Sequence, residues 1–385
     1  MSELGERILA EARKEEEAMV SFLMELASLE SPSDVPESQL PVQALLTRSL
    51  EELGFRVRKI LGRKAGGALY AVPRDRLRGR PAQLLLGHCD TVWKVGTLDT
   101  MPVVRGENRL RGPGVFDMKA GLTQMIVALR ILKRLGLEPE VTPVILINSD
   151  EEIGSPDSAR IIRLLSRRVV RAFVPEPAMG PQGKLKTVRK GVGRFVLRVK
   201  GRAAHAGLDP TGGASAILEL SYLIQKVHAM TDLERGVTFN VGVISGGTRP
   251  NVIAPEAVAE VDVRILSGAD GEEAESWIRG LTTTVPGTAL EVEGGILIPP
   301  LERTPRNRAL WEQARRAAGE LGLDLEEEVA GGGSDGNTTS QFTATLDGLG
   351  AVGDGAHAPH EFLFVDRQVE RCALLALLLL LPPGG

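Results

Sequence analysis

The sequence predicts an α/β protein with a mostly parallel sheet flanked by helices, interrupted by a second domain. Three observations support this prediction. In the first 187 residues, short apolar runs typical of buried strands alternate with segments of helical period. Histidine or acidic residues follow several of these runs directly. From about residue 188 to residue 298, the order of expected elements becomes that of the split βαββαβ, or ferredoxin-like, motif.

The expected elements of the first domain follow from the spacing of its apolar residues. Helical spacing over 6–29 and over 41–53 predicts two opening helices, the second closed by Gly54. The later runs are short, apolar and separated by charged or Gly-rich turns, so they predict strands. Strands are expected at 55–61, 68–72, 83–87, 143–148 and 172–174, and a helix at 118–135.

The inserted domain is expected to run strand, helix, strand, strand, helix, strand. The expected ranges are 193–200, 213–230, 238–245, 257–266, 271–284 and 289–293. A motif of this size is self-contained, and a chain of 385 residues is long enough for about two domains. We therefore expect one domain formed by 1–187 and 299–385, and an inserted domain over 188–298.

The composition excludes several classes of protein. Hydrophobic residues make up 43% of the chain and charged residues 25%, which is typical of a soluble globular protein and not of a disordered one. The net charge of −4, without a clustered basic stripe, argues against nucleic acid and against a membrane surface as partners.

Neither end of the chain predicts export or membrane insertion. Residues 1–17 are dense in charges and lack the apolar core of a secretory signal. The apolar run 372–381 is shorter than the ~20 residues that span a bilayer, so it predicts a buried terminal helix. Only Cys89 and Cys372 are present, too few for a disulfide framework. A cytoplasmic location is therefore expected.

A set of histidine and acidic residues predicts a site for two metal ions. Its members are His88, Asp117, Glu152, Glu176 and His357. Several of them follow apolar runs, and the carboxyl ends of parallel strands converge on one crevice. Zn²⁺ takes His, Asp and Glu ligands at ~2.0 to 2.2 Å, and a carboxylate such as Asp117 can bridge two ions ~3.5 to 4 Å apart. Two Zn²⁺ ions per subunit are expected, with Co²⁺ and Mn²⁺ as alternatives.

Two further acidic residues predict supporting roles. The side chains of neighbouring Glu151 and Glu152 diverge in extended backbone, so one can bind metal while the other faces substrate. With Glu152 as the ligand, Glu151 is the candidate general base, which takes a proton from water and returns it to the leaving amine. Asp90, two residues after His88, is the candidate acceptor of the second ring N–H of that histidine.

Each of these residues also has a structural interpretation. A single histidine before a loop, or a single Glu-Glu pair, is usually structural or solvated, but here several such sites agree. His88 and His357 fall in Gly-rich loops, where a core role is less natural. His360 is expected to be a spacer and His228 to be structural. Cys89 is expected to pack in the core, because its side chain points away from that of His88 in a strand.

Six motifs between residues 87 and 361 contain most of these residues, and the resemblance that they carry covers nearly the whole chain. They are Gly-His-Cys-Asp-Thr-Val (87–92), Gly-Pro-Gly-Val-Phe-Asp-Met-Lys-Ala-Gly (112–121), Ser-Asp-Glu-Glu-Ile-Gly-Ser (149–155), Gly-Arg-Ala-Ala-His-Ala-Gly (201–207), Gly-Gly-Gly-Ser-Asp-Gly-Asn (331–337) and Gly-Ala-His-Ala-Pro-His-Glu (355–361). The motifs resemble those of the di-zinc aminoacylase and carboxypeptidase metallopeptidase family. The resemblance is greatest to the glutamate carboxypeptidase, or carboxypeptidase G, branch, with acetylornithine and succinyl-diaminopimelate deacetylases as relatives.

The resemblance implies a distribution of ligands over two zinc ions. Asp117 would bridge the ions, with His88 and Glu176 on one of them and Glu152 and His357 on the other. This agrees with the ligand set that the residues themselves predict. The family also implies a cis peptide bond directly after the bridging aspartate.

The resemblance implies roles for residues outside the ligand set. Glu151 would be the catalytic base. The inserted domain would act as a lid and as a dimer surface, and His205 would stabilise the tetrahedral oxyanion. In several relatives that histidine comes from the partner subunit. Asn251, Arg264 and Gly332 match positions that contact substrate, Arg264 by binding a carboxylate. The structural alternatives are that His205 starts a helix and that Arg264 is a solvated strand charge.

One departure from the family bears on the substrate. Relatives often carry arginine directly before a Pro-Pro pair, whereas this chain has Ile298 before Pro299 and Pro300. Without that arginine, the sequence does not single out a C-terminal glutamate as the substrate. The resemblance as a whole implies hydrolysis of an amide bond next to a free carboxylate, in an N-acyl amino acid, a folate-like conjugate or a short peptide, by a homodimeric enzyme. The alternatives are an N-acyl diamino acid deacylase and, from another class, a non-catalytic protein that binds amino-acid derivatives.

Overall fold

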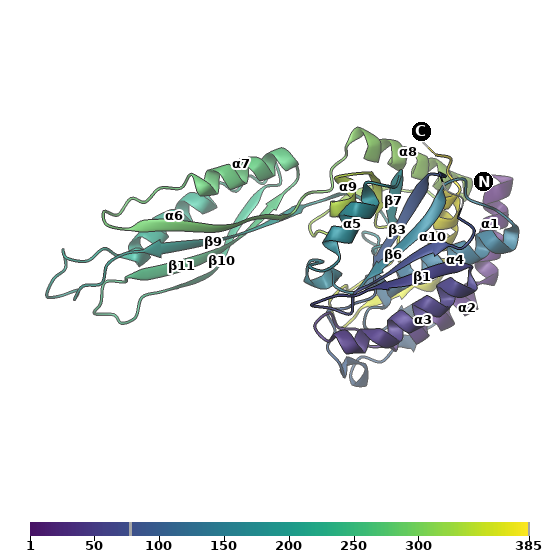
Figure 1. Ribbon diagram of the computed structural model, residues 1–385, viewed down its shortest axis with the longest axis horizontal. Helices are drawn as coiled ribbons and strands as arrows, with labels where there is room; N and C mark the ends of the chain where they lie inside the picture. Colours follow the sequence, from purple (N-terminus) through teal and green to yellow (C-terminus); the bar gives the residue numbers. More distant parts are fainter. Residues whose placement is uncertain (77–78, 384–385) are drawn as a thin grey trace. The chain divides into compact units, whose positions relative to one another are not determined.

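The structure is a computed structural model, which describes residues 1–76 and 79–383. It contains two compact units, which are drawn together in Figure 1. Unit 1 comprises Met1–Thr187, Arg303–Ala330 and the chain from Ser334 onward, and unit 2 comprises Val188–Glu302 and Gly331–Gly333. Unit 1 combines a mixed sheet with helices and unit 2 has a sheet of its own, so the predicted fold class is confirmed.

Unit 1 is built on an eight-stranded sheet in the order β1-β2-β6-β3-β7-β14-β8-β13. The strands are β1 (Phe55–Ile60), β2 (Ala68–Pro73), β3 (Ala82–His88), β6 (Thr142–Asn148), β7 (Arg171–Val174), β8 (Leu185–Arg189), β13 (Glu327–Ala330) and β14 (Ala344–Asp347). The four central strands β6, β3, β7 and β14 run parallel. Their carboxyl ends therefore meet at one edge of the sheet.

Helices pack on both faces of the large sheet of unit 1. They are α1 (Glu3–Lys14), α2 (Glu16–Ala27), α3 (Gln39–Glu52), α4 (Ala120–Leu135), α5 (Ala159–Ser166), α8 (Pro305–Glu320), α9 (Asp335–Ser340) and α10 (Val365–Leu379). Every residue of β3, β6 and β7 is buried. Alternate residues pack on opposite faces: Leu85 joins the core under α4 and α10, whereas Leu84 joins the core under α5. The continuous apolar runs of the sequence reflect this two-sided burial.

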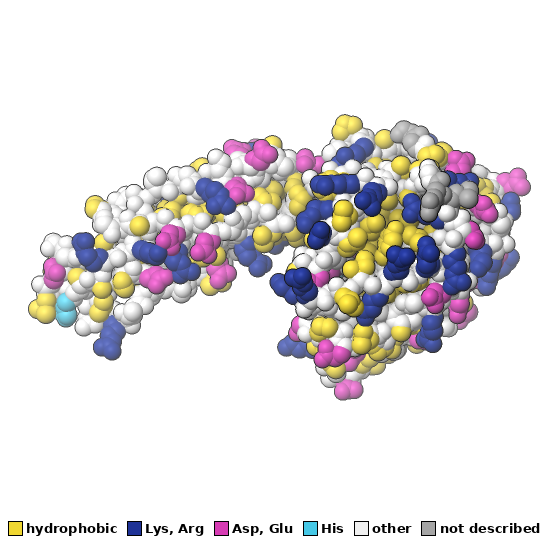
Figure 2. Space-filling model, in the orientation of Figure 1, with side chains coloured by type: hydrophobic (Ala, Val, Ile, Leu, Met, Phe, Trp, Pro, Cys, Tyr) yellow, Lys and Arg dark blue, Asp and Glu magenta, His cyan; other side chains and the backbone are white. Residues whose placement is uncertain are grey.

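The face under α5 is the less covered one. Ile60, Tyr70 and Val72 belong to its cluster and are only partly buried. Figure 2 shows apolar side chains exposed over the region where Figure 1 draws β3, β6 and β7, with Lys and Arg side chains around them. On the other face, α10 buries most of its residues, as expected for a terminal core helix. None of the helices in the described ranges is long and apolar enough to cross a membrane.

The first predicted helix is wrong in one respect. The sequence predicts a single helix over 6–29, but the structure has α1 and α2, which meet at Glu15. Glu15 is buried, and its carboxylate forms ion pairs with Arg130 and Arg134 of α4. The chain turns at this residue, and both helices then pack against α4.

A second, small sheet in unit 1 escaped prediction. Its order is β15 (Gly353–Asp354), β16 (Phe362–Phe364), β5 (Arg109–Arg111), β4 (Val104–Arg105). Strands of two or three residues are too short to show a hydrophobic period. The sheet pairs Phe362 with Arg111. It thereby joins the segment that precedes Asp117 to the segment that follows His357.

Unit 2 has the predicted βαββαβ order. Its elements are β9 (Gly191–Lys200), α6 (Ala216–His228), β10 (Thr238–Gly246), β11 (Glu256–Ile265), α7 (Gly268–Arg279) and β12 (Ala289–Ile298). The sheet is antiparallel in the order β10-β11-β9-β12, which leaves β10 and β12 as edge strands. Both helices pack on the sheet around Phe195, Leu197 and Val261. The last strand is longer than predicted and runs to Ile298.

Candidate metal centre

Three strand ends bring candidate ligands to one edge of the large sheet. His88 is the last residue of β3. Glu151 and Glu152 lie in a short 3-10 helix, Glu151–Ile153, shortly after β6 ends. Glu176 follows β7 by two residues. Because β3, β6 and β7 are parallel neighbours, these side chains reach the same crevice.

Two loops supply the remaining candidate ligands. Asp117 lies in the irregular turn Val115–Lys119 that leads into α4, and its peptide bond to Met118 is cis. A Cβ at Gly121 would collide with the carbonyl oxygen of Pro175, so glycine lets this turn approach the chain beside Glu176 closely. His357 lies between β15 and β16 with a φ of 61°, a left-handed conformation that a histidine rarely adopts. Such backbone conformations cluster at functional sites.

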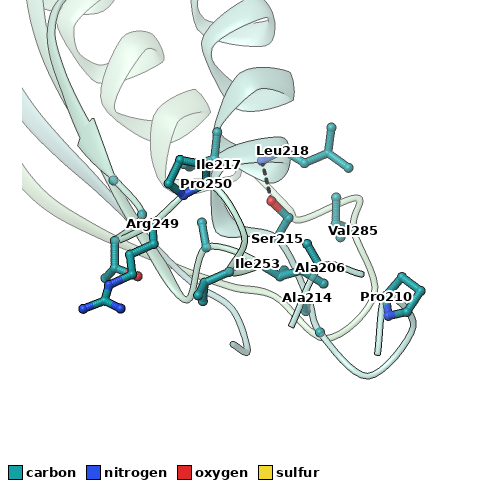
Figure 3. Close-up of a pocket in the computed structure, with 16 residues that line it drawn as sticks. Ala206, Pro210, Ala214, Ser215, Ile217, Leu218, Arg249, Pro250, Ile253 and Val285 are labelled. Carbon is teal, nitrogen blue, oxygen red and sulfur yellow. Dashed lines mark hydrogen bonds between the residues drawn. The ribbon is translucent and has the colours of Figure 1, made fainter. Parts of the chain in front are cut away.

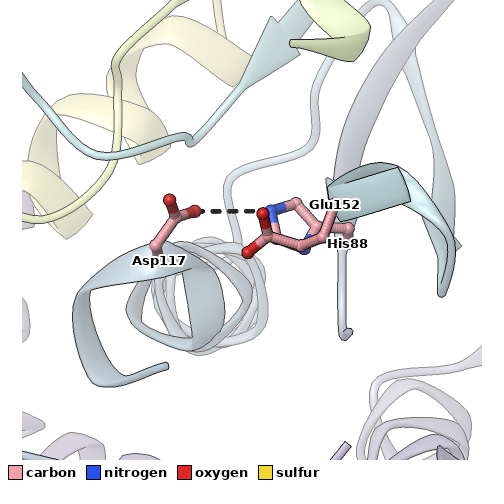
Figure 4. Close-up of side chains that lie close together, drawn as sticks. All are labelled: His88, Asp117 and Glu152. Atoms are coloured by element: carbon pink, nitrogen blue, oxygen red, sulfur yellow. Dashed lines mark ion pairs between the residues drawn. The ribbon is translucent and has the colours of Figure 1, made fainter. Parts of the chain in front are cut away.

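The two carboxylate oxygens of Asp117 face different partners. Oδ1 lies 3.4 Å from Nε2 of His88, and that nitrogen lies 3.3 Å from Oε1 of Glu176. Oδ2 lies 3.4 Å from Nε2 of His357, which lies 3.0 Å from Oε2 of Glu152. Figure 4 shows His88, Asp117 and Glu152 pointing toward one another from three separate elements. Asp117 therefore stands between a His88–Glu176 pair and a His357–Glu152 pair.

These residues fit a pair of divalent metal ions. Ligand atoms held tetrahedrally at ~2.0 to 2.2 Å from Zn²⁺ lie about 3.3 to 3.6 Å from each other, close to most of the distances observed here. Nε2 of His88, Oδ1 of Asp117 and Oε1 of Glu152 are buried and, within the described part of the chain, have no hydrogen-bond partner. Buried polar atoms rarely lack a hydrogen-bond partner in folded proteins. Imidazole nitrogen and carboxylate oxygen are also the donor types that such ions take.

The electrostatics of the site also favour cations. Burial raises the pKa of Glu151 well above its usual value, and the neighbouring charges of Glu176, Asp335 and Glu152 raise it further. Hydrogen bonding to Asp117 and Glu152 raises the pKa of His357 to about 10. Burial by itself raises the pKa of Asp117, but His357 and His88 lower it, and the net result is a pKa below the usual value. A concentration of buried negative charge is stabilised by bound cations.

Asp90 supports the site more widely than the sequence predicts. Nδ1 of His88 lies 3.0 Å from the backbone carbonyl oxygen of Asp90 and 3.3 Å from its carboxylate. That carboxylate also accepts hydrogen bonds from the backbone N–H groups of Glu151 and Glu152, at 3.3 and 3.2 Å, and from the Ser33 hydroxyl at 2.6 Å. Asp90 thus ties the end of β3 to the turn that carries the candidate base.

Sequence reasoning missed other residues around the centre. Asp335 is buried, accepts hydrogen bonds from Asn148 and Ser155, and has a pKa raised by burial to about 7. Glu361 is fully buried and accepts hydrogen bonds from the loop that carries Asp117. The charge of Lys186 helps to lower the pKa of Asp117. The motifs 331–337 and 355–361 contain the first two residues, but no spacing rule assigned them a role.

The other predicted site residues lie in unit 2. His205 and Asn251 are exposed on two loops that pair through the Ala206 N–H and the Asn251 carbonyl oxygen, 3.0 Å apart. Nδ1 of His205 accepts backbone N–H groups from Gly207 and Leu208 at 3.2 and 3.1 Å. The ring proton therefore resides on Nε2, which makes that atom a hydrogen-bond donor.

Arg264 and Gly332 complete the predicted set. Arg264 lies in β11 and makes two hydrogen bonds to the carboxylate of Asp262, at 2.8 and 3.1 Å. Its charge is therefore partly balanced within unit 2. The carbonyl oxygen of Gly332 accepts a hydrogen bond from Arg189 at 3.2 Å.

A hollow in unit 2 lies beside the His205 and Asn251 loops. It has a volume of about 750 Å³, and Figure 3 shows it between the loop at Arg249 and Pro250 and the start of α6. The Ser215 hydroxyl accepts the Leu218 N–H at 3.2 Å and so caps this helix. Apolar side chains supply most of the hollow, and Arg249 is its one cationic lining residue within the described chain.

Cys89 is expected to resist alkylation in the folded protein. Its side chain is fully buried, and burial raises the pKa of its thiol to about 12, so the reactive thiolate is scarce below that pH. Cys372 is also fully buried. Mass spectrometry after iodoacetamide treatment at pH 8 should detect no modification until denaturant is added. Rapid labelling of Cys89 in the native protein would contradict its placement in the core. His360 is exposed, and its role as a spacer stays a prediction.

Comparison with known proteins identifies the family of this chain. The family model described as peptidase family M20/M25/M40 matches residues 84–381, which include all five candidate ligands. The chain belongs to this peptidase family. It is 27% identical over 357 residues to carboxypeptidase G2 of Pseudomonas sp. strain RS-16, covering 90% of this chain and 85% of that protein. It is 26% identical over 378 residues to acetylornithine deacetylase of Myxococcus xanthus, covering 93% and 96%.

A solved structure of the M20 family shares the fold. The YxeP protein of Bacillus subtilis, described as a dinuclear metal binding peptidase, superposes with a TM-score of 0.70 at 16% identity and covers 96% of this chain and 98% of that one. Membership of the M20 family identifies this protein as a hydrolytic enzyme. The resemblance to metallopeptidases and aminoacylases predicted from the motifs is therefore confirmed.

Proposed function

We propose that this protein is a two-metal amidohydrolase that releases an amino acid with a free carboxylate from an N-acyl amino acid, a folate-like conjugate or a short peptide. The observation that carries the proposal is the position of Asp117 between the His88–Glu176 and His357–Glu152 pairs. A carboxylate so placed suits a bridge between two ions. The five side chains would hold two Zn²⁺ ions, with Co²⁺ or Mn²⁺ as alternatives.

Each residue of the site then has a part in hydrolysis. When bound, the ions would polarise the attacked carbonyl and make a water molecule more acidic. Glu151 would take the proton from the attacking water and return it to the leaving amine. Its raised pKa suits a group that must both accept and release that proton. Asp90 would fix the backbone positions of Glu151 and Glu152 by accepting hydrogen bonds from their N–H groups.

Unit 2 would complete the site by acting as a lid. His205 presents Nε2–H, which would donate a hydrogen bond to the tetrahedral oxyanion. We propose this role for a histidine of either the same subunit or the partner. Asn251, Arg264 and Gly332 would contact the substrate, with Arg264 directed at its carboxylate. Since Arg264 already pairs with Asp262 and Ile298 cannot bind an anion, we expect weaker selection for a second, side-chain carboxylate than for the terminal one.

Two rival functions use the same fold. An N-acyl diamino acid deacylase would differ only in its pocket, and the relation to acetylornithine deacetylase supports this alternative. A non-catalytic protein that binds amino-acid derivatives would keep the ligands without turnover. The presence of Glu151 beside the five candidate ligands argues for catalysis.

A substrate panel tests the proposal. The protein is stripped with a chelator, restored with Zn²⁺ or Co²⁺, and assayed for free amino acid from N-acyl-glutamate, other N-acyl amino acids, N-acetyl-ornithine and dipeptides. Metal-dependent cleavage beside a free carboxylate supports the proposed activity. Preference for N-acetyl-ornithine would favour the deacylase, and binding of metal without any cleavage would favour the binding protein.

We also propose that the enzyme is a cytoplasmic homodimer that associates through unit 2. Its edge strand β10 exposes Val243 and Ile244, and α6 exposes Ile217, Leu218 and Tyr222. An unpaired edge with exposed apolar side chains favours strand pairing between copies.

Ile244→Glu is expected to shift the mass measured by light scattering from dimer to monomer. Leu233→Glu, at another exposed leucine of unit 2, should leave the dimer intact. A monomeric wild-type protein would contradict the assignment.

A further inference from the structure

Glu361 is a buried carboxylate with an unusual set of partners. Its side chain is fully excluded from solvent. Oε1 accepts the backbone N–H groups of Phe116 and Asp117, at 2.9 and 3.0 Å. Oε2 accepts the backbone N–H of Gly114 at 2.9 Å and the indole N–H of Trp93 at 2.8 Å. All four partners are donors, which is the pattern that an ionised carboxylate satisfies and a protonated or amide group does not.

The partners of Glu361 lie in the segment that carries the candidate bridging ligand. Three of the four donors belong to residues 114–117, which form the turn before α4. Asp117 is itself one of them, so the carboxylate holds the backbone of that residue directly. A bridging ligand must place both oxygens accurately, and backbone hydrogen bonds fix where its side chain begins.

The backbone of Glu361 lies in the segment that carries a second candidate ligand. His357 is four residues earlier in the same loop. The Glu361 N–H donates to the carbonyl oxygen of Ala358 at 2.9 Å, and its own carbonyl oxygen accepts the Gly112 N–H at 3.3 Å. A Cβ at Gly355 would lie 2.9 Å from the Cα of Glu361, so glycine is needed for the loop to close this tightly. One residue thereby connects the loops of His357 and Asp117.

We propose that Glu361 is a positioning residue that sets the distance between Asp117 and His357 and so assembles the site for the second metal ion. This inference rests on the proposed two-metal centre. Asp90 has a similar positioning role elsewhere in the candidate metal centre, where its carboxylate holds the turn of Glu151 and Glu152. Both carboxylate oxygens of Glu361 are engaged by these four donors, so Glu361 would act through the ligands that it places.

Glu361→Gln tests the proposal with an almost isosteric change. The amide NH₂ cannot accept hydrogen bonds, so about half of the four donors lose their acceptor inside a buried site. We expect Co²⁺ to bind 10- to 100-fold more weakly, the range seen when residues that orient metal ligands are replaced. The visible spectrum of bound Co²⁺ should also change, because the ligand geometry changes. In the metal-free protein, amides of residues 112–119 should exchange hydrogen for deuterium faster.

Glu30→Gln is the matched control. Glu30 also accepts two backbone N–H groups, from Gly96 at 2.8 Å and Leu98 at 3.1 Å, but it holds no ligand-bearing segment. Its replacement should leave the Co²⁺ affinity and spectrum as in the wild type. Should Glu361→Gln fail to fold, Glu361→Asp keeps the charge but shortens the reach, and we expect weaker Co²⁺ binding from it too.

Wild-type Co²⁺ affinity, an unchanged spectrum and unchanged exchange over 112–119 in the folded Glu361 variants would overturn the proposal. Failure of the two-metal function would look different, because the wild-type protein itself would then bind no Co²⁺. In that case the exchange of residues 112–119 in the metal-free proteins still decides whether Glu361 orders the Asp117 loop.

Discussion

Replacing Glu151 with glutamine is expected to remove nearly all turnover and to leave metal binding intact. Glu151 lies beside the candidate ligands, and burial and the surrounding carboxylates raise its pKa, which suits a group that shuttles a proton. The amide keeps the shape of the side chain but can neither accept nor return that proton. General bases contribute about 10²- to 10⁴-fold, so kcat should fall by that factor.

The neighbouring residue provides the control for this prediction. Glu152→Gln changes the same chemical group one position later, where the carboxylate lies 3.0 Å from Nε2 of His357. We expect this variant to lose metal as well as activity, whereas Glu151→Gln loses activity alone. Measurements of kcat and of bound metal by atomic emission on both variants separate the two roles. Retention of full activity by Glu151→Gln would remove that residue from the mechanism.

Replacing Asp117 with asparagine is expected to have an effect of similar size through a different cause. The two oxygens of Asp117 face separate partners, and an amide can offer an oxygen to only one of them. Bound metal should fall to one ion or fewer per subunit. Activity should fall about a thousandfold, since metal ions supply several kcal/mol of charge stabilisation and each factor of ten is about 1.4 kcal/mol.

Thermal unfolding gives an independent measure of the Asp117 change. Metal that binds only the folded state stabilises it by about 2.7 kcal/mol when its concentration is a hundred times Kd. The wild-type Tm should therefore rise when Zn²⁺ or Co²⁺ is added to the stripped protein, and Asp117→Asn should show a much smaller rise. An equal rise in both proteins would mean that the ions bind elsewhere.

Much of the fold was predictable because it depends on local periodicity. The runs before His88, before Glu151 and before Glu176 are continuous and apolar, and they became the central strands β3, β6 and β7, buried on both faces. Their parallel order then explains why residues far apart in sequence meet at one edge. The βαββαβ order of unit 2 was visible for the same reason.

Features that depend on long-range contacts were not predictable from periodicity. The helix break at Glu15 coincides with ion pairs between its carboxylate and Arg130 and Arg134, which lie more than one hundred residues away. The small sheet consists of strands too short to carry a pattern, yet it joins the loops of Asp117 and His357. Glu361 lies within a motif, but three of its hydrogen-bond donors lie about 245 residues earlier, which no spacing rule reveals.

The substrate is the part of the function with the least support from sequence. The candidate ligands and the candidate base lie in short motifs at strand ends, whereas the proposed substrate contacts involve residues of unit 2 such as Asn251 and Arg264. Arg264 is partly balanced by Asp262, and that contact was invisible in the sequence because neighbouring charges on a strand usually face solvent. Substrate preference should therefore respond to changes at Arg264 and Asp262 together.

The most direct test is to count metal ions and measure turnover in the same titration. Stripped protein is given increasing Zn²⁺ or Co²⁺, and bound metal and release of amino acid from the best substrate are followed together. We predict that activity rises with binding and saturates at two ions per subunit. Full activity in the stripped protein, or activity that does not depend on the bound ions, would contradict a two-metal hydrolase.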